Sequence, residues 1–109
     1  MADTPEAKVK ERIRNLLKAH GAYWHSPVQN GMGTPALDFH VCHKGRYAGI
    51  EAKAPTKHLT PRQEITRREI GRAGGVVFVI GEIDLRNVLH EKHEYSGMAE
   101  LEAWLLGLL

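Results

Sequence analysis

The sequence predicts a single α/β domain with the order helix, strand, strand, strand, helix, strand, followed by a helical tail. Two observations support this prediction. Apolar residues recur at helical spacing near both ends of the chain, and they alternate or run together in the segments between. The helix expected between the third and fourth strands allows a parallel crossover. Because 109 residues are too few for two hydrophobic cores, residues 1–109 form one domain, with a core at about 4–80 and the helical tail at about 83–109.

The first helix is expected at residues 4–20. Thr4 is a suitable N-cap residue, Pro5 suits the first helical position, and Gly21 ends the helix. One face of this helix is apolar, as expected for a helix that packs on a sheet. The residues of that face are Val9, Ile13, Leu16 and Leu17.

Three strands are expected next. Residues 22–28 predict a short edge strand, because aromatic and β-branched residues surround Pro27, which is tolerated at sheet edges. Residues 37–42 alternate between apolar and polar, and residues 47–54 follow a turn at residues 44–45. This pattern predicts a β-hairpin.

The second helix is expected at residues 60–73, where Gln63 occupies the capping-box position. The uninterrupted apolar run at 76–80 predicts a strand buried on both faces, and therefore the central strand. The tail predicts two further helices, at about 83–90 and 98–108, that pack on the core.

Composition excludes several classes of protein. The single Cys42 cannot form an internal disulfide, and the N-terminus lacks the basic and then apolar pattern of an export signal, so we expect a cytoplasmic protein. No apolar run is long enough to cross a membrane, and no membrane partner is expected. The net charge of +2 is small, so an acidic partner would be recognised by a local cluster of basic residues. No zinc site is expected, because the spacing of the histidines and the cysteine fits no zinc motif.

The candidate site lies in the predicted hairpin. Glu51 and Lys53 share one face of their strand, because side chains alternate along a strand. Asp38 interrupts an apolar pattern in the preceding strand, and antiparallel pairing can bring it beside Glu51 if a bulge or offset adjusts the register. Two adjacent carboxylates persist most easily when a divalent cation lies between them, and oxygen ligands favour Mg²⁺, with Mn²⁺ as a substitute.

Such a metal site suits phosphodiester hydrolysis, with Lys53 orienting the attacking water or stabilising the transition state. The alternative is that Glu51 and Lys53 form a solvated strand face and that Asp38 begins a turn. Glu6 lies along the apolar stripe of the first helix, either as a further metal ligand or as a charge that stabilises the helix N-terminus. Gln63 is expected to cap its helix, to position Lys53 or to touch substrate.

Basic residues follow the carboxylate strand and predict contacts with DNA phosphates, although charged helix faces are more often simply solvated. The polar loop before the hairpin is also expected to contact the nucleic-acid backbone. The predicted nucleic-acid-binding residues are Lys57, Arg62, Arg67, Arg68 and Gln29.

Four stretches of the sequence, in this order, resemble the PD-(D/E)XK nuclease superfamily, and within it the small VRR-NUC type that many phages carry. The stretches are Gly33-Thr-Pro-Ala-Leu-Asp38, Gly49-Ile-Glu51-Ala-Lys53, Leu59-Thr-Pro-Arg-Gln63 and Ala73-Gly-Gly-Val-Val-Phe-Val-Ile80. The resemblance runs from about Glu6 to Ile80 and does not cover the tail.

The resemblance implies a restriction-endonuclease-like three-layer core and a metal held by Asp38, Glu51 and the backbone carbonyl of Ala52. It further implies that Lys53 is the catalytic lysine, that Gln63 assists in the active site, and that Glu6 is the acidic residue of the first helix. Members of this group often form homodimers, and some cut branched or flapped DNA. The expected function is therefore that of a Mg²⁺- or Mn²⁺-dependent endonuclease acting on DNA.

Two other functions remain open at this point. The chain could be a nucleic-acid-binding module that holds no metal and is catalytically inactive. It could instead be an interaction protein that offers the apolar face of its last helix to a partner. That face comprises Leu101, Trp104, Leu105 and Leu108.

Overall fold

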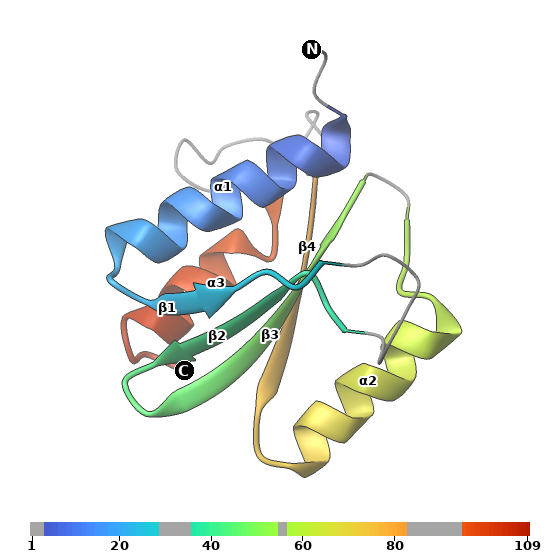
Figure 1. Ribbon diagram of the computed structural model, residues 1–109. Coiled ribbons are helices and arrows are strands. Elements are labelled where there is room, and N and C mark those ends of the chain that lie inside the picture. The colour runs from blue at the N-terminus through green and yellow to red at the C-terminus, as the bar shows by residue number, and fades with distance from the viewer. Residues whose placement is uncertain (1–3, 29–35, 55–56, 83–94) are drawn as a thin grey trace.

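The computed structural model describes residues 4–28, 36–54, 57–82 and 95–109, and shows a mixed sheet between two layers of helices (Figure 1). The strand order in the sheet is β1-β2-β3-β4-β5. Helices α1 and α3 cover one face, and α2 lies against the other. The predicted α/β class and the element order through the fourth strand are confirmed. The elements are α1 (Pro5–Ala19), β1 (Tyr23–His25), β2 (Phe39–His43), β3 (Arg46–Lys53), α2 (Pro61–Arg72), β4 (Val76–Glu82), β5 (Tyr95–Ser96) and α3 (Met98–Leu105).

Helix α1 forms for the reasons that its sequence indicates. The Thr4 hydroxyl accepts a hydrogen bond of 3.0 Å from the backbone N–H of Ala7, and Pro5 occupies the first turn. Gly21 then adopts a positive φ of 70° where the chain turns towards β1. Three apolar side chains of the helix are fully buried against the sheet: Val9, Ile13 and Leu17.

The β2–β3 hairpin needs no bulge, so the expected adjustment of register is wrong. Lys44 and Gly45 both have positive φ, 53° and 77°, which is the backbone of the two-residue turn that matches strand twist. The paired residues therefore run from His43 opposite Arg46 to Phe39 opposite Ile50. Continued by one residue, this register sets Asp38 directly opposite Glu51.

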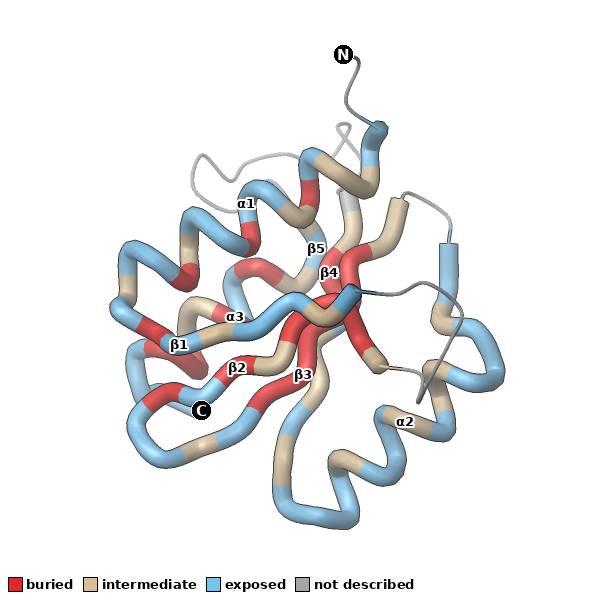
Figure 2. Tube along the Cα trace, in the orientation of Figure 1, coloured by how far each residue is buried: buried red, intermediate tan, exposed pale blue. Residues whose placement is uncertain are grey.

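The prediction that Val76–Ile80 is the central strand, buried on both faces, is also wrong. Strand β3 is central, between antiparallel β2 and parallel β4. In β4, Val76 and Val79 remain 40% and 38% exposed. Figure 2 shows why: buried residues gather in β2, β3 and the inner sides of α1 and α3, whereas α2 contributes no buried residue. The apolar run thus reflects parallel pairing with β3 and only partial cover by α2.

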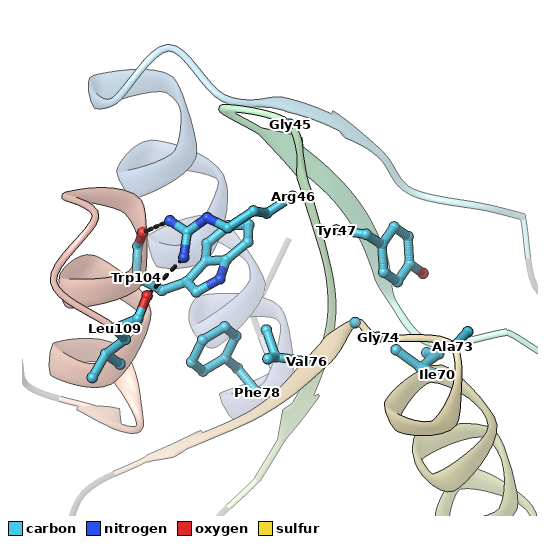
Figure 3. Close-up of a pocket in the computed structure, with 11 residues that line it drawn as sticks. Gly45, Arg46, Tyr47, Ile70, Ala73, Gly74, Val76, Phe78, Trp104 and Leu109 are labelled. Atoms are coloured by element: carbon cyan, nitrogen blue, oxygen red, sulfur yellow. Dashed lines mark hydrogen bonds between the residues drawn. The ribbon is translucent and has the colours of Figure 1, made fainter.

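The tail contributes to the main core. In α3 the side chains of Leu101, Trp104 and Leu105 are buried, so three of the four residues considered for a partner face are occupied within the chain. Arg46 fastens this helix to the hairpin (Figure 3). Its guanidinium lies 4.6 Å from the Trp104 ring centroid and donates hydrogen bonds to the carbonyls of Trp104 and Leu109.

The first predicted tail helix, at 83–90, lies outside the described residues, and strand β5 was not predicted. Strand β5 pairs with the end of β4 and leads directly into α3. Within the described residues, no helix has the length and apolar character needed to cross a membrane.

Helix α2 approaches the sheet over two glycines. A Cβ atom on Gly49 would lie 3.2 Å from Ile70 Cδ1 and 2.9 Å from Leu37 Cδ1. A Cβ atom on Gly75 would lie 2.8 Å from Ile70 Cγ2 and 2.9 Å from Tyr47 Cδ1. The bare backbone at these two positions therefore sets how closely Ile70, and with it α2, packs on the sheet.

This packing predicts opposite effects for two glycine substitutions. We expect Gly49→Ala to lower the free energy of unfolding by about 1–2 kcal/mol, because the added methyl group overpacks the contacts with Leu37 and Ile70. Gly71 lies in α2, and a Cβ atom added there meets no atom within 4 Å. Gly71→Ala should therefore raise the free energy of unfolding by roughly 0.5 kcal/mol. Urea denaturation of both variants measures the difference, and equal effects would contradict this account of α2 packing.

Candidate active site

Asp38 and Glu51 are locked together across the β2–β3 hairpin. The backbone N–H of Asp38 donates to Glu51 Oε1 at 3.2 Å, and the backbone N–H of Ala52 donates to Asp38 Oδ2 at 2.9 Å. Both residues are nearly excluded from solvent, with 8% and 4% of their surface exposed. Buried carboxylates need such hydrogen bonds, and here each one is oriented by the backbone of the other strand.

The proximity of the two carboxyl groups shows in their electrostatics. Burial, and then the negative charge of Asp38, raise the pKa of Glu51 to about 7, while Lys53 and the hydrogen bond from the Asp38 backbone oppose this shift. Lys53 therefore offsets the burial of Glu51 only in part. A carboxyl group in this condition gains strongly from a further positive charge nearby.

Lys53 lies where the sequence predicts. Its ammonium group is 3.8 Å from Glu51 Oε2, and its side chain is only 12% exposed. The two residues project from the same face of β3, because one residue separates them. This lysine therefore faces the same small volume as the two carboxylates.

The side-chain amide of Gln63 forms two hydrogen bonds. Its Oε1 accepts a hydrogen bond of 2.9 Å from the backbone N–H of Thr60, and its Nε2 donates to Glu51 Oε2 at 2.9 Å. Gln63 thus completes the capping box of α2 and orients Glu51. Helix capping was one of the roles expected for Gln63, and the structure shows it. Positioning of Lys53 was another, but the hydrogen bond is made to Glu51.

Lys10 is a site residue that the sequence analysis did not identify. Its ammonium group lies 3.5 Å from Asp38 Oδ1 and 3.5 Å from Glu6 Oε2. Glu6, with 45% of its side chain exposed, thus meets the carboxylate pair through Lys10. The available signal was the spacing of four residues between Glu6 and Lys10, which places both on one side of α1.

The donor set fits a hard divalent cation. Asp38 and Glu51 supply carboxylate oxygens, and the carbonyl of Ala52 stands on the strand between Glu51 and Lys53. Among the described residues, no three His, Cys, Asp or Glu side chains come together. The protein would therefore fill only part of a coordination shell and leave the rest to water or substrate oxygens, as Mg²⁺ prefers.

The predicted basic residues do not form one patch. Arg62 faces the β2 side of α2, whereas Lys57 and Arg67 line a depression on the β4 side. Arg67 is paired with Glu64 through hydrogen bonds of 3.1 Å and 3.0 Å. Arg68 is exposed between these two sides. Gln29, the remaining candidate, lies outside the described residues.

Comparison with known proteins identifies the fold. The chain has a restriction-endonuclease-like α/β fold with a buried Asp and Glu-x-Lys arrangement on adjoining strands. A solved structure described as a VRR_NUC domain matches it with a TM-score of 0.60 and 23% sequence identity, over 71% of this chain and 84% of that one. The chain therefore has the fold of a VRR-NUC domain, as the motifs had implied. The sequence matches no protein-family model and no curated protein.

The raised pKa of Glu51 predicts a pH-dependent stability in the absence of divalent cations. Between pH 4.5 and about 7 the unfolded chain ionises this carboxyl group while the folded chain keeps its proton, so the free energy of unfolding falls as pH rises. The loss is complete above pH 7 and amounts to about 3 kcal/mol at most.

Urea denaturation in EDTA across this pH range measures the effect, with Glu51→Gln as the matched control. The neutral amide cannot ionise, so the variant should lose less stability than the parent over the same range. Added Mg²⁺ should restore the parent above pH 7 and leave the variant unchanged. Identical pH profiles for the two proteins would contradict the assignment of the shift to Glu51.

Proposed function

We propose that this protein is a metal-dependent endonuclease that hydrolyses phosphodiester bonds in DNA. The observation that carries the proposal is the interlocked, buried pair of Asp38 and Glu51 with Lys53 on the same face. The shared fold and the order of the motifs support the same reading. Branched or flapped DNA is the proposed substrate, and Mg²⁺ or Mn²⁺ the proposed cofactor.

The residues of the site would divide the work between holding the cation and contacting the substrate. Asp38, Glu51 and the Ala52 carbonyl would hold the cation, which when bound supplies Lewis-acid stabilisation of a phosphoryl oxygen. Gln63 keeps Glu51 in its binding rotamer through the 2.9 Å hydrogen bond. Lys53 presents its ammonium protons to the attacking water or to a non-bridging phosphate oxygen.

Lys10 has a different role. It neutralises Asp38 while the carboxylate has no other cation beside it, at a separation of 3.5 Å. A cation held by Asp38 would take up that charge and leave the ammonium group available to a phosphate oxygen of the DNA backbone. Lys10 contacts the pair from α1 through Asp38, whereas Gln63 contacts it from α2 through Glu51.

The central prediction concerns Glu51→Ala and Lys53→Met. Each should reduce cleavage of labelled DNA by about 10²-fold or more, because Glu51→Ala removes a ligand of the proposed cation and Lys53→Met removes an ammonium group that stabilises negative charge in the transition state. The assay uses linear, single-stranded, flapped and four-way DNAs with Mg²⁺, Mn²⁺ or EDTA. Calorimetric titration with Mg²⁺ should show one site that Glu51→Ala abolishes and Lys53→Met retains.

The same assay decides between the nuclease and an inactive binding module. A module would bind the DNAs in EDTA and in Mg²⁺ alike, take up no cation in calorimetry and cleave none of them. Full activity of Glu51→Ala would contradict the proposal directly. Circular dichroism of each variant confirms that its fold is intact.

A second prediction separates the two contacts of Gln63. Gln63→Ala removes both the cap and the hydrogen bond to Glu51, whereas Thr60→Ala disrupts the same capping box and leaves the contact with Glu51 in place. Both should cost about 1 kcal/mol of stability. Only Gln63→Ala should also weaken Mg²⁺ affinity or activity, by about 10- to 100-fold. Equal activities of the two variants would reduce Gln63 to a helix cap.

A further inference from the structure

A recess of about 400 Å³ lies between α2 and the strands β2 and β3. Its volume is within the range of about 300–1,000 Å³ that is typical of ligand sites. His40 of β2 and Tyr47 of β3 line one wall. The remaining lining residues are Ala36, Arg62, Thr66, Glu69, Ile70 and Ala73.

The recess adjoins the carboxylate pair. His40 follows Asp38 by two residues, so both side chains project from the same face of the sheet about 7 Å apart along the strand. On the opposite wall, Arg62 directly precedes Gln63, which contacts Glu51. A phosphodiester held at the carboxylates therefore has a neighbouring nucleotide within reach of the recess.

Two aromatic rings form the sheet side of the recess. The His40 and Tyr47 ring centroids are 5.9 Å apart at an angle of 41°, and the Tyr47 hydroxyl is hydrogen-bonded to His40 Nδ1. A Cβ atom on Gly75 would lie 2.9 Å from Tyr47 Cδ1, so the Tyr47 ring packs beside the bare backbone of this glycine. Pre-positioned rings of this kind are stacking surfaces that accept any nucleobase, because every base has a π-face.

The charged side chains at the rim of the recess suit a nucleobase better than a phosphate group. Arg62 and Glu69 are seven residues apart on α2 and line the same recess with opposite charges. In the described part of the chain, no ion pair or hydrogen bond engages either of these side-chain charges. The Glu69 carboxylate repels a phosphodiester, whereas the edge of a nucleobase offers both donors and acceptors to this pair.

We propose that this recess binds an unpaired nucleobase of the nucleotide adjoining the scissile phosphodiester. The inference rests on the proposed nuclease function and specifies its substrate class. A base within continuous duplex must be unstacked and unpaired before it can enter, whereas a base in a flap, gap or single strand is already available. The recess therefore favours DNA with an unpaired nucleotide at the cut.

The test compares two flapped DNAs that differ by a single base. One carries a normal unpaired nucleotide beside the mapped cut, and the other an abasic residue with the same backbone. The parent protein should cleave the normal substrate with a kcat/KM about 10-fold higher, since stacking of one base is lost in the abasic DNA. His40→Ala should cleave the two substrates alike, because the substitution removes one ring and the hydrogen bond that holds the other, Tyr47, in place.

Tyr23→Ala is the matched control. Tyr23 is 70% exposed on the edge strand β1 and does not line the recess, so its removal should preserve the 10-fold preference. If His40 had only a structural role, His40→Ala would slow both substrates by one factor and keep their ratio. That result, or a parent protein indifferent to the missing base, would overturn the recess proposal while DNA cleavage itself stands.

A binding measurement tests the recess without cleavage. Glu51→Ala is mixed with the flapped DNA carrying 2-aminopurine at the same position, whose fluorescence is quenched on stacking. We expect the Glu51→Ala protein to quench the 2-aminopurine fluorescence and the double variant Glu51→Ala/His40→Ala to leave it unquenched. Quenching together with an inactive parent protein would overturn the proposed nuclease function and keep the base site. The absence of quenching would overturn the base site.

Discussion

The geometry of the candidate site depends on the reciprocal hydrogen bonds that join Asp38 to β3 and Glu51 to the backbone of Asp38. Each carboxylate accepts a backbone N–H from the other strand, at 3.2 Å and 2.9 Å. The arrangement requires an unbulged register, and the two-residue turn at Lys44 and Gly45 provides it. A slip of one residue would turn every side chain of β3 to the opposite face and bury Lys53 against α1 and α3.

The same two strands serve the fold and the site with opposite faces. On one face, Phe39, Ile50 and Ala52 are fully buried beneath α1 and α3. On the other face, Glu51 accepts a hydrogen bond from Gln63 in the first turn of α2, a helix that contributes no buried residue. The apolar layer supplies the stability that tolerates a carboxylate pair in which the pKa of one member is raised to about 7.

Local patterns in the sequence were sufficient to predict most of the elements and part of the site. Caps at Thr4 and Thr60, alternation in the hairpin and the pair of Glu51 and Lys53 are properties of single segments, which a sequence displays directly. The central strand was misplaced because an apolar run reports parallel pairing and burial alike. Lys10 was missed because its contact with Asp38 joins α1 to the β2 end of the hairpin, and no local period records such a contact.

The two helices beside the site contact the carboxylate pair through different chemical groups, an amide from α2 and an ammonium group from α1. Helix α2 reaches Glu51 through an uncharged amide at 2.9 Å, so it fixes geometry without adding charge. Helix α1 reaches Asp38 through the ammonium group of Lys10 at 3.5 Å, so it adds charge on a long and flexible side chain. A cation that settles between the carboxylates would displace the mobile charge and keep the fixed amide. Under the proposed cation binding, Glu51 would keep its hydrogen bond with Gln63, and Asp38 would exchange Lys10 for the cation.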